Sequence, residues 1–298
     1  MQKLTSGILA AVLILLLLTP IALAKPDIGK PLPATDVELV KKITLHGKPG
    51  AGGKPAKGAA TGILGEQLGA GANKYAIIIG ISDYPGEAND LEYCDDDAED
   101  MYRTLTIAYG YSDDNVVLLK STSATFSAIE GAINSIRSKV VPGDEVVFFF
   151  SGHGAKGKAN DGDDERIDEA IVVHNGAVLI AIWDGQLRDW FAEFKTTRIV
   201  FIFDSCLAGG MTDLKAPGRI INMACSESGT SLESEVWQNG QFTYYFVDQG
   251  MLQSQADKYD NLPGGADVTV EEAFDYAKAN CQWQTPSISD SFTNDLLL

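Results

Sequence analysis

Apolar runs of strand length alternate with amphipathic segments from residue 74 to the end of the chain. Because the runs are apolar at successive positions, both faces of each strand should be covered, which is typical of parallel sheets. Between and after them, apolar residues recur at helical spacing. The alternation predicts an α/β protein, a three-layer αβα sandwich with a mainly parallel sheet, in a single domain over 74–298. The predicted strands are 75–81, 115–120, 144–151, 198–204 and 219–225, and the predicted helices are 95–108, 123–140, 183–194, 241–252 and 270–281.

Local signals suggest where some of these elements begin. Ser123 and Asp184 stand where helix N-caps are expected, because their side chains can accept hydrogen bonds from the first free backbone N–H groups. The turn Pro142-Gly143-Asp144 precedes the third strand.

The first 73 residues have a different character. Residues 1–24 are typical of a signal peptide, with Lys3 before a short apolar run and the small-residue end Ala22-Leu23-Ala24. An uncleaved membrane anchor is the alternative, and either reading predicts a secreted or extracytoplasmic protein. Residues 25–73 are rich in Gly, Ala, Pro and Lys from His46 onward, which predicts a flexible basic pro-segment or linker.

Charge narrows the choice of partners. The net charge is −18 and the pI is near 4.4. A nucleic-acid partner is not expected, because phosphate binding needs clustered Lys and Arg. The first 74 residues hold 9 Lys against 4 acidic residues, so a basic leader precedes an acidic body.

The chain has four cysteines, Cys94, Cys206, Cys225 and Cys281, and none of them has CxxC spacing. This argues against a zinc site or a disulfide scaffold. One bridge between Cys225 and Cys281 stays open for an exported protein.

Two predicted strands end in reactive residues. VVFFF leads into Ser151-Gly152-His153-Gly154, and VFIF leads into Asp204-Ser205-Cys206. A buried His or Cys usually has only a structural role. Functional sites in open α/β sheets gather at the carboxyl ends of strands, so a functional role is favoured for a His and a Cys at that place. A thiol nucleophile, an imidazole that moves the proton and backbone N–H donors form a cysteine-peptidase site. The expected oxyanion donors are the N–H groups of Gly154 and Cys206.

FFFSGHG followed about fifty residues later by FDSC resembles the caspase-like peptidases of clan CD, and the metacaspases most closely. The resemblance covers roughly residues 74–290. It implies cleavage after Arg or Lys, with a P1 pocket formed by Asp97, Ser151 and Asp204. A carboxylate pair suits a guanidinium or ammonium group and would repel an acidic P1 residue.

The resemblance also implies calcium as an activator, although no cofactor is expected for the chemistry itself. Asp168, Asp184 and Asp213 occupy the matching ligand positions, whereas Gly185 departs from the pattern. The acidic run Asp161–Glu165 lacks the EF-hand spacing and could equally be a solvated loop.

The basic leader suggests a zymogen that is processed by its own activity. Lys57 and Lys74 are the predicted processing sites, and Lys54 is a poorer one because Pro55 follows it. A plain tether is the alternative reading. We expect a monomer whose partners are protein or peptide substrates. The rival functions are a catalytically silent caspase-like binding module, a calcium-binding surface protein and an Asp- or Asn-specific peptidase.

Overall fold

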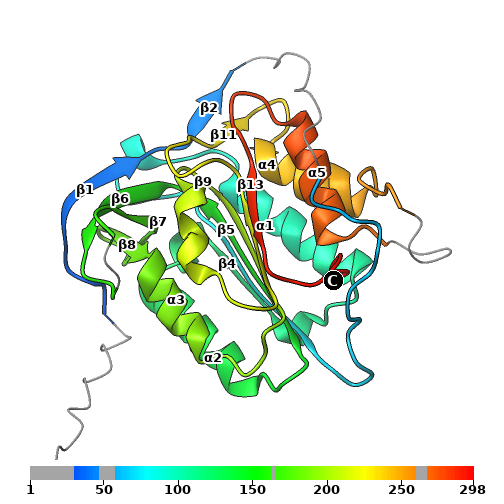
Figure 1. The fold of residues 1–298 in the computed structure, drawn as a ribbon. Helices are drawn as coiled ribbons and strands as arrows, with labels where there is room; N and C mark the ends of the chain where they lie inside the picture. Colours follow the sequence, from blue (N-terminus) through cyan, green and yellow to red (C-terminus); the bar gives the residue numbers. More distant parts are fainter. Residues whose placement is uncertain (1–29, 47–57, 163–164, 260–266) are drawn as a thin grey trace, which may run out of the picture.

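A six-stranded sheet forms the centre of the protein (Figure 1). The computed structural model describes residues 30–46, 58–162, 165–259 and 267–298. Neighbouring strands in the order β10-β9-β5-β3-β4 are parallel, and β13 adds an antiparallel edge next to β10. The strands are β3 Lys74–Gly80, β4 Val116–Lys120, β5 Glu145–Gly152, β9 Ile199–Ser205, β10 Arg219–Met223 and β13 Ser287–Asp290.

Helices cover both faces of this sheet. Along β5, Phe148 and Phe150 pack into the core beneath α2 and α3, whereas Val147 and Phe149 pack into the core beneath α1 and α5. This two-sided burial explains the unbroken apolar runs and confirms the predicted three-layer sandwich. The helices are α1 Cys94–Arg103, α2 Phe126–Lys139, α3 Asp184–Ala192, α4 Gln241–Thr243 and α5 Val270–Asn280; α1 continues into a π-helical turn at Thr104–Ala108 and α4 into another at Tyr244–Leu252.

Both predicted helix caps are wrong by one or two residues. Thr125, not Ser123, caps α2 by accepting a hydrogen bond from Ala128 N. Ser123 instead belongs to a short 3-10 turn, Ser121–Ser123, ahead of the helix. Asp184 is the first residue of α3, and Trp183 is its N-cap. A sequence with several candidate caps does not show which one leaves the helical conformation first.

Two smaller sheets lie at the carboxyl ends of the central strands. One has the order β1-β6-β7-β8 and the other β12-β11-β2. Their strands are β1 Ala34–Val40, β2 Ile43–Leu45, β6 Gly154–Ala159, β7 Asp168–His174, β8 Leu179–Trp183, β11 Leu232–Ser234 and β12 Asn239–Gly240.

The predicted linker over 25–73 is therefore partly structured. β1 pairs antiparallel with β6, and β2 pairs parallel with β11, so the segment Ala34–Leu45 crosses from one small sheet to the other. It mixes polar and apolar side chains, about half of them exposed, and the backbone hydrogen bonds of the sheet edges hold it. Composition alone does not reveal this kind of pairing. Lys54 and Lys57 lie outside the described residues.

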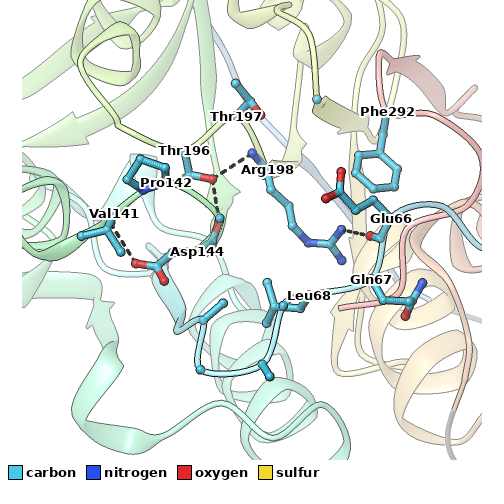
Figure 2. Close-up of a pocket in the computed structure, with 16 residues that line it drawn as sticks. Glu66, Gln67, Leu68, Val141, Pro142, Asp144, Thr196, Thr197, Arg198 and Phe292 are labelled. Carbon is cyan, nitrogen blue, oxygen red and sulfur yellow. Dashed lines mark hydrogen bonds between the residues drawn. The ribbon is translucent and has the colours of Figure 1, made fainter.

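A cavity of ≈ 580 Å³ lies at the amino edge of the central sheet, away from the strand ends that carry His153 and Cys206 (Figure 2). Arg198 stands in it and donates to Glu145 Oε2 at 2.6 Å, Glu66 O at 2.7 Å and Leu297 O at 2.6 Å. The guanidinium thus ties the residues before β3 and the C-terminal residues to the sheet. We assign this cavity a structural role.

All four cysteines are free and buried, so the open Cys225–Cys281 bridge does not form in this structure. In the part of the chain that the structure describes, none of the helices has the length and apolar character needed to span a bilayer. The predicted signal peptide over 1–24 lies outside that part.

Candidate active site

Parallel pairing of β5 with β9 brings the two reactive segments together. Ser151 lies opposite Asp204, and Gly152 lies opposite Ser205, so His153 and Cys206 follow directly at the same edge of the sheet. Both side chains are buried. The structure thus places the predicted dyad residues on adjacent strand ends.

Backbone and aromatic contacts orient His153. Its Nε2 lies 2.8 Å from Asn89 O, and its ring stacks on Tyr84 with 4.8 Å between the centroids. Because a carbonyl oxygen only accepts, Nε2 carries the proton. Nδ1 is then an acceptor, and it receives a hydrogen bond from the backbone N–H of Lys42 at 3.2 Å. This tautomer leaves the Nδ1 lone pair able to accept a proton.

Cys206 lies at a tight turn directly after β9. The next residue, Leu207, has φ 60°, a left-handed conformation that is uncommon for a residue with a side chain. Leu207 N donates to Gly229 O at 2.9 Å and so fixes the turn. The backbone N–H of Ser231 points at Cys206 Sγ from 3.3 Å. Strained turns of this kind occur at functional sites, where surrounding contacts hold them.

Both dyad residues are neutral in this conformation. Burial lowers the pKa of His153 to about 4, despite its hydrogen bond with Asn89 O. Burial raises the pKa of Cys206 to about 11, although the Ser231 N–H and the charge of Lys42 lower it. A neutral thiol is a poor nucleophile, so Cys206 must lose its proton before it can attack a carbonyl group.

Gly154 lies in close contact with the nucleophile's backbone. A Cβ at this position would overlap the carbonyl group of Cys206. The position therefore requires glycine. The oxyanion role of the Gly154 and Cys206 N–H groups stays a prediction.

The three predicted P1 residues form one buried pocket. Ser151 Oγ donates to Asp97 Oδ2 at 2.6 Å. Asp204 Oδ2 accepts from Thr243 N at 2.9 Å and Thr243 Oγ1 at 2.8 Å. Burial and the neighbouring charge of Asp204 raise the pKa of Asp97 to about 7 although Lys42 lowers it, so a cation in the pocket favours the ionised carboxylate.

The protein's own Lys42 fills this pocket. Its Nζ lies 3.0 Å from Asp204 Oδ1 and 3.4 Å from Asp97 Oδ2, and it donates to Ser151 Oγ at 3.0 Å. The side chain is fully buried. Burial opposes its charge, but the neighbouring acidic groups, Asp204 foremost, together outweigh burial, so the pKa of Lys42 is well above its usual value. The pocket therefore accommodates a primary ammonium group.

Sequence reasoning missed several residues of the pocket wall. Gly240 N donates to Asp97 Oδ1 at 2.7 Å, and a Cβ at Gly240 would overlap Asp204 Oδ2 and lie 2.5 Å from Lys42 Nζ. Ser231 Oγ donates to Asp204 Oδ1. Ser231 directly precedes β11 and Gly240 ends β12, and neither a serine nor a glycine at such a place marks a pocket wall in the sequence.

The predicted calcium ligands are brought together in part. Carboxylate oxygens of Asp161, Asp168 and Asp184 lie within 4.8 Å of one another, and Glu165, Glu169 and Asp184 form an overlapping group. Asp213 instead forms an ion pair with Arg188 Nη1 at 2.8 Å. Asp161 Oδ2 accepts from Gly185 N at 3.2 Å and occupies the space that a side chain at Gly185 would take. The oxygen-only donor set fits calcium.

Lys74 is a poor processing site. It begins β3, a central strand, and its Nζ donates to Tyr109 O at 2.8 Å. It lies at the amino edge of the sheet, opposite the dyad, and cleavage there would cut the chain at the first residue of a core strand. These contacts weigh against Lys74, and its role as a processing site stays a prediction.

Comparison with known proteins supports the geometry. The fold resembles a crystal structure of a Geobacter sulfurreducens protein, with a TM-score of 0.55 and 16% identity over 73% of this chain and 92% of that one. Residues 74–215 match the family model described as metacaspase, peptidase C14 domain. The fold and the adjacent His153 and Cys206 define a caspase-like domain.

Curated proteins that are similar to this region include two metacaspases. Metacaspase-4 of Arabidopsis thaliana is 34% identical over 148 residues, which are 47% of this chain and 34% of that protein. Metacaspase-1 of Saccharomyces cerevisiae is 30% identical over 173 residues, which are 55% of this chain and 38% of that protein. Residues 74–215 are thus similar to metacaspases, and the match spans little more than a third of the length of these relatives.

Proposed function

We propose that the chain is a cysteine endopeptidase that cleaves peptide bonds after Arg or Lys. Cys206 Sγ attacks the carbonyl carbon of the P1 residue while its proton passes to His153 Nδ1. The imidazolium then protonates the leaving nitrogen, and water hydrolyses the resulting thioester. Asn89 O keeps Nε2 protonated, so Nδ1 is available for both transfers.

The observation that carries the proposed specificity is the pocket around Asp97 and Asp204. It buries two carboxylates within 3.4 Å of an ammonium group. A buried carboxylate pair without a cation is costly, so the pocket favours a P1 side chain that supplies one. An acidic P1 residue would add repulsion.

A scan of fluorogenic peptides that differ only at P1 tests this specificity. Because Lys42 fills the pocket, wild type and Lys42→Ala are both assayed. We expect cleavage after Arg and Lys and little after Asp or Asn. Asp204→Asn, made in the Lys42→Ala background, should lower kcat/KM for Arg and Lys peptides by roughly 100-fold or more, because one partner of a buried ion pair is lost.

Asp100→Asn is the matched control for that substitution. Asp100 lies on α1 one turn after Asp97, and its carboxylate contacts Arg103 and Asn239 rather than Lys42. The control removes the same charge close to the pocket and should retain most activity. Preferred cleavage after Asp, or equal activity of Asp204→Asn and its parent, would refute the specificity.

The rival function is a silent caspase-like binding module. The neutral His153 and the buried, neutral Cys206 fit that function as well. Labelling with an arginyl chloromethylketone decides between the two functions. A peptidase in the Lys42→Ala form should be modified at Cys206 only when His153 is intact, whereas a binding module should show no labelling that depends on His153.

Calcium activation is part of the proposal and rests on the acidic cluster of Asp161, Asp168 and Asp184. Calcium at this cluster would neutralise buried carboxylates and stabilise the fold by mass action, by about 2.7 kcal/mol at 100 times its dissociation constant. We expect chelation to lower both Tm and peptidase activity, calcium to restore both, and Asp161→Asn to weaken the response. Full activity and an unchanged Tm after chelation would contradict calcium activation.

Export and self-processing complete the proposal. The signal-like residues 1–24 support a secreted form, or a membrane-anchored form if they are not removed. Lys57 remains the proposed processing site, since it stands in the Gly- and Lys-rich stretch before the domain. N-terminal sequencing of wild type and Cys206→Ala would show whether any cut there depends on the nucleophile.

A further inference from the structure

The segment Ala34–Leu45 passes directly across the dyad. Before Lys42, Val40 pairs with Gly154, the residue after His153. After Lys42, Ile43 pairs with Leu232, the residue after Ser231, whose N–H contacts Cys206 Sγ. The segment therefore occupies the place of a substrate backbone, with the Lys42 side chain in the P1 pocket.

The direction of the segment is wrong for hydrolysis. Cleavage after Lys42 requires His153 to protonate the nitrogen of Ile43, which would be the leaving group. In the structure His153 Nδ1 accepts instead from the N–H of Lys42 at 3.2 Å. The N–H of Ile43 donates to Ser231 O at 3.1 Å. The Lys42–Ile43 peptide bond thus lies on one side of Lys42, and His153, which would have to protonate its nitrogen, lies on the other.

A productive substrate must run in the opposite direction. With its P1 side chain in the same pocket and its leaving nitrogen near His153, the residues before P1 would lie along β11. They would pair antiparallel with Leu232–Ser234, whereas β2 pairs parallel with it. The observed pairing therefore competes with substrate for the same strand edge.

The segment is held on both sides of the dyad. Antiparallel pairing of β1 with β6 secures one side, and Thr44 Oγ1 donates to Glu233 Oε1 at 2.7 Å on the other. The ion pairs Lys156–Glu38 and Lys158–Asp36 are exposed and add little. Lys42 itself makes the only contacts of the segment that reach the P1 carboxylates, among the residues that the structure describes.

We infer that residues 34–45 are a built-in inhibitor that binds the cleft in the reverse direction, with Lys42 as a P1 mimic that the dyad does not cleave. The inference rests on the proposed peptidase function. It differs from self-processing at Lys42, because the inhibitor must leave the cleft rather than be cut within it.

Kinetics of the full chain test the inhibitor. Lys42→Ala should raise kcat/KM for an arginyl peptide at least tenfold over wild type. Lys41→Ala removes the same charge from the neighbouring exposed residue and should leave kcat/KM close to wild type. Lys42→Arg keeps a cation for the pocket and should remain inhibited. Equal activity of wild type and Lys42→Ala would overturn the inference.

Mass spectrometry tests the direction. After prolonged incubation the wild-type chain should retain its Lys42–Ile43 bond. A synthetic peptide of residues 34–45 should inhibit the Lys42→Ala protein competitively and be recovered intact, and the same peptide with Ala at position 42 should not inhibit. A product that begins at Ile43 would overturn the reverse binding.

Thiol reactivity separates this inference from the peptidase function. Iodoacetamide should alkylate Cys206 faster in Lys42→Ala than in wild type or Lys41→Ala, whether or not any peptide is cleaved. If no variant cleaves peptides but Cys206 becomes reactive only in Lys42→Ala, the inhibitor stands and the peptidase proposal fails. If reactivity is the same in all three proteins, the inhibitor proposal fails.

Discussion

Replacing Cys206 by alanine is expected to abolish cleavage of Arg and Lys peptides, by at least about 10⁴-fold in kcat/KM when the change is made in the Lys42→Ala protein. Without the thiol no thioester can form, and the pocket and His153 can only bind and orient the peptide. KM should change little, because the P1 contacts with Asp97 and Asp204 remain.

Cys225→Ala is the matched control for this experiment. Cys225 is a second buried, free thiol, and its Sγ donates to Ser205 O at 3.3 Å, close to the nucleophile. Its removal should lower stability slightly and leave kcat near that of the parent. Residual hydrolysis in Cys206→Ala that is still sensitive to thiol reagents would assign the nucleophile to another cysteine.

Gly240→Ala is expected to cause the second-largest loss, of roughly 100- to 1,000-fold in kcat/KM for Arg and Lys peptides. The added methyl group would overlap Asp204 Oδ2 and lie 2.5 Å from the position of the bound ammonium nitrogen. The cation and the carboxylate could no longer meet, and breaking a buried ion pair costs about 3–5 kcal/mol. The change is made in the Lys42→Ala protein, so that Lys42 does not compete.

Gly131→Ala provides the comparison. Gly131 is an exposed residue of α2 with open space where its Cβ would lie, so this alanine should be neutral or slightly stabilising. Gly240→Ala should also lower the labelling of Cys206 by an arginyl reagent while leaving iodoacetamide alkylation unaffected. A variant that keeps full activity on Arg peptides would place the P1 side chain outside this pocket.

The central layer of the fold could be predicted because each of its strands leaves a recognisable pattern within a few consecutive residues. The inner strands β3, β5, β9 and β10 are buried on both faces, and that burial requires the unbroken apolar runs that are visible in the chain. His153 and Cys206 could be predicted for a related reason, since each directly follows such a run at the functional edge of the sheet. Matching strand ends were enough to bring two distant residues together.

Lys42 could not be predicted from the sequence. It lies in a short stretch of mixed polar and apolar residues next to the Gly-rich segment, and its partners Asp97, Ser151 and Asp204 are far along the chain. Backbone pairing at two sheet edges holds the stretch, and such pairing places few demands on side chains. The role of Gly240 could not be predicted either, because it depends on the absence of a side chain and on the position of Asp204 in the folded protein.

The acidic cluster shows a different limit. The family resemblance indicated Asp184 and Asp213 as ligands and showed that Gly185 lacks the expected side chain. The carboxylate of Asp161, from the loop after β6, occupies the space that a side chain at Gly185 would take. Asp161 comes close to position 185 only in the folded chain. The sequence therefore shows that position 185 lacks a carboxylate, but not that Asp161 supplies one there.

The pairing of β1 with β6 has a consequence for solubility. When the inhibitor leaves, the backbone groups of Gly154–Ala159 that β1 now covers become a free sheet edge, and free edges attract other chains and promote aggregation. Lys156 and Lys158 lie on that edge, and they now pair with Glu38 and Asp36 of the inhibitor. After its departure they would remain as unpaired positive charges, which discourage a second copy of the same edge from adding to the sheet.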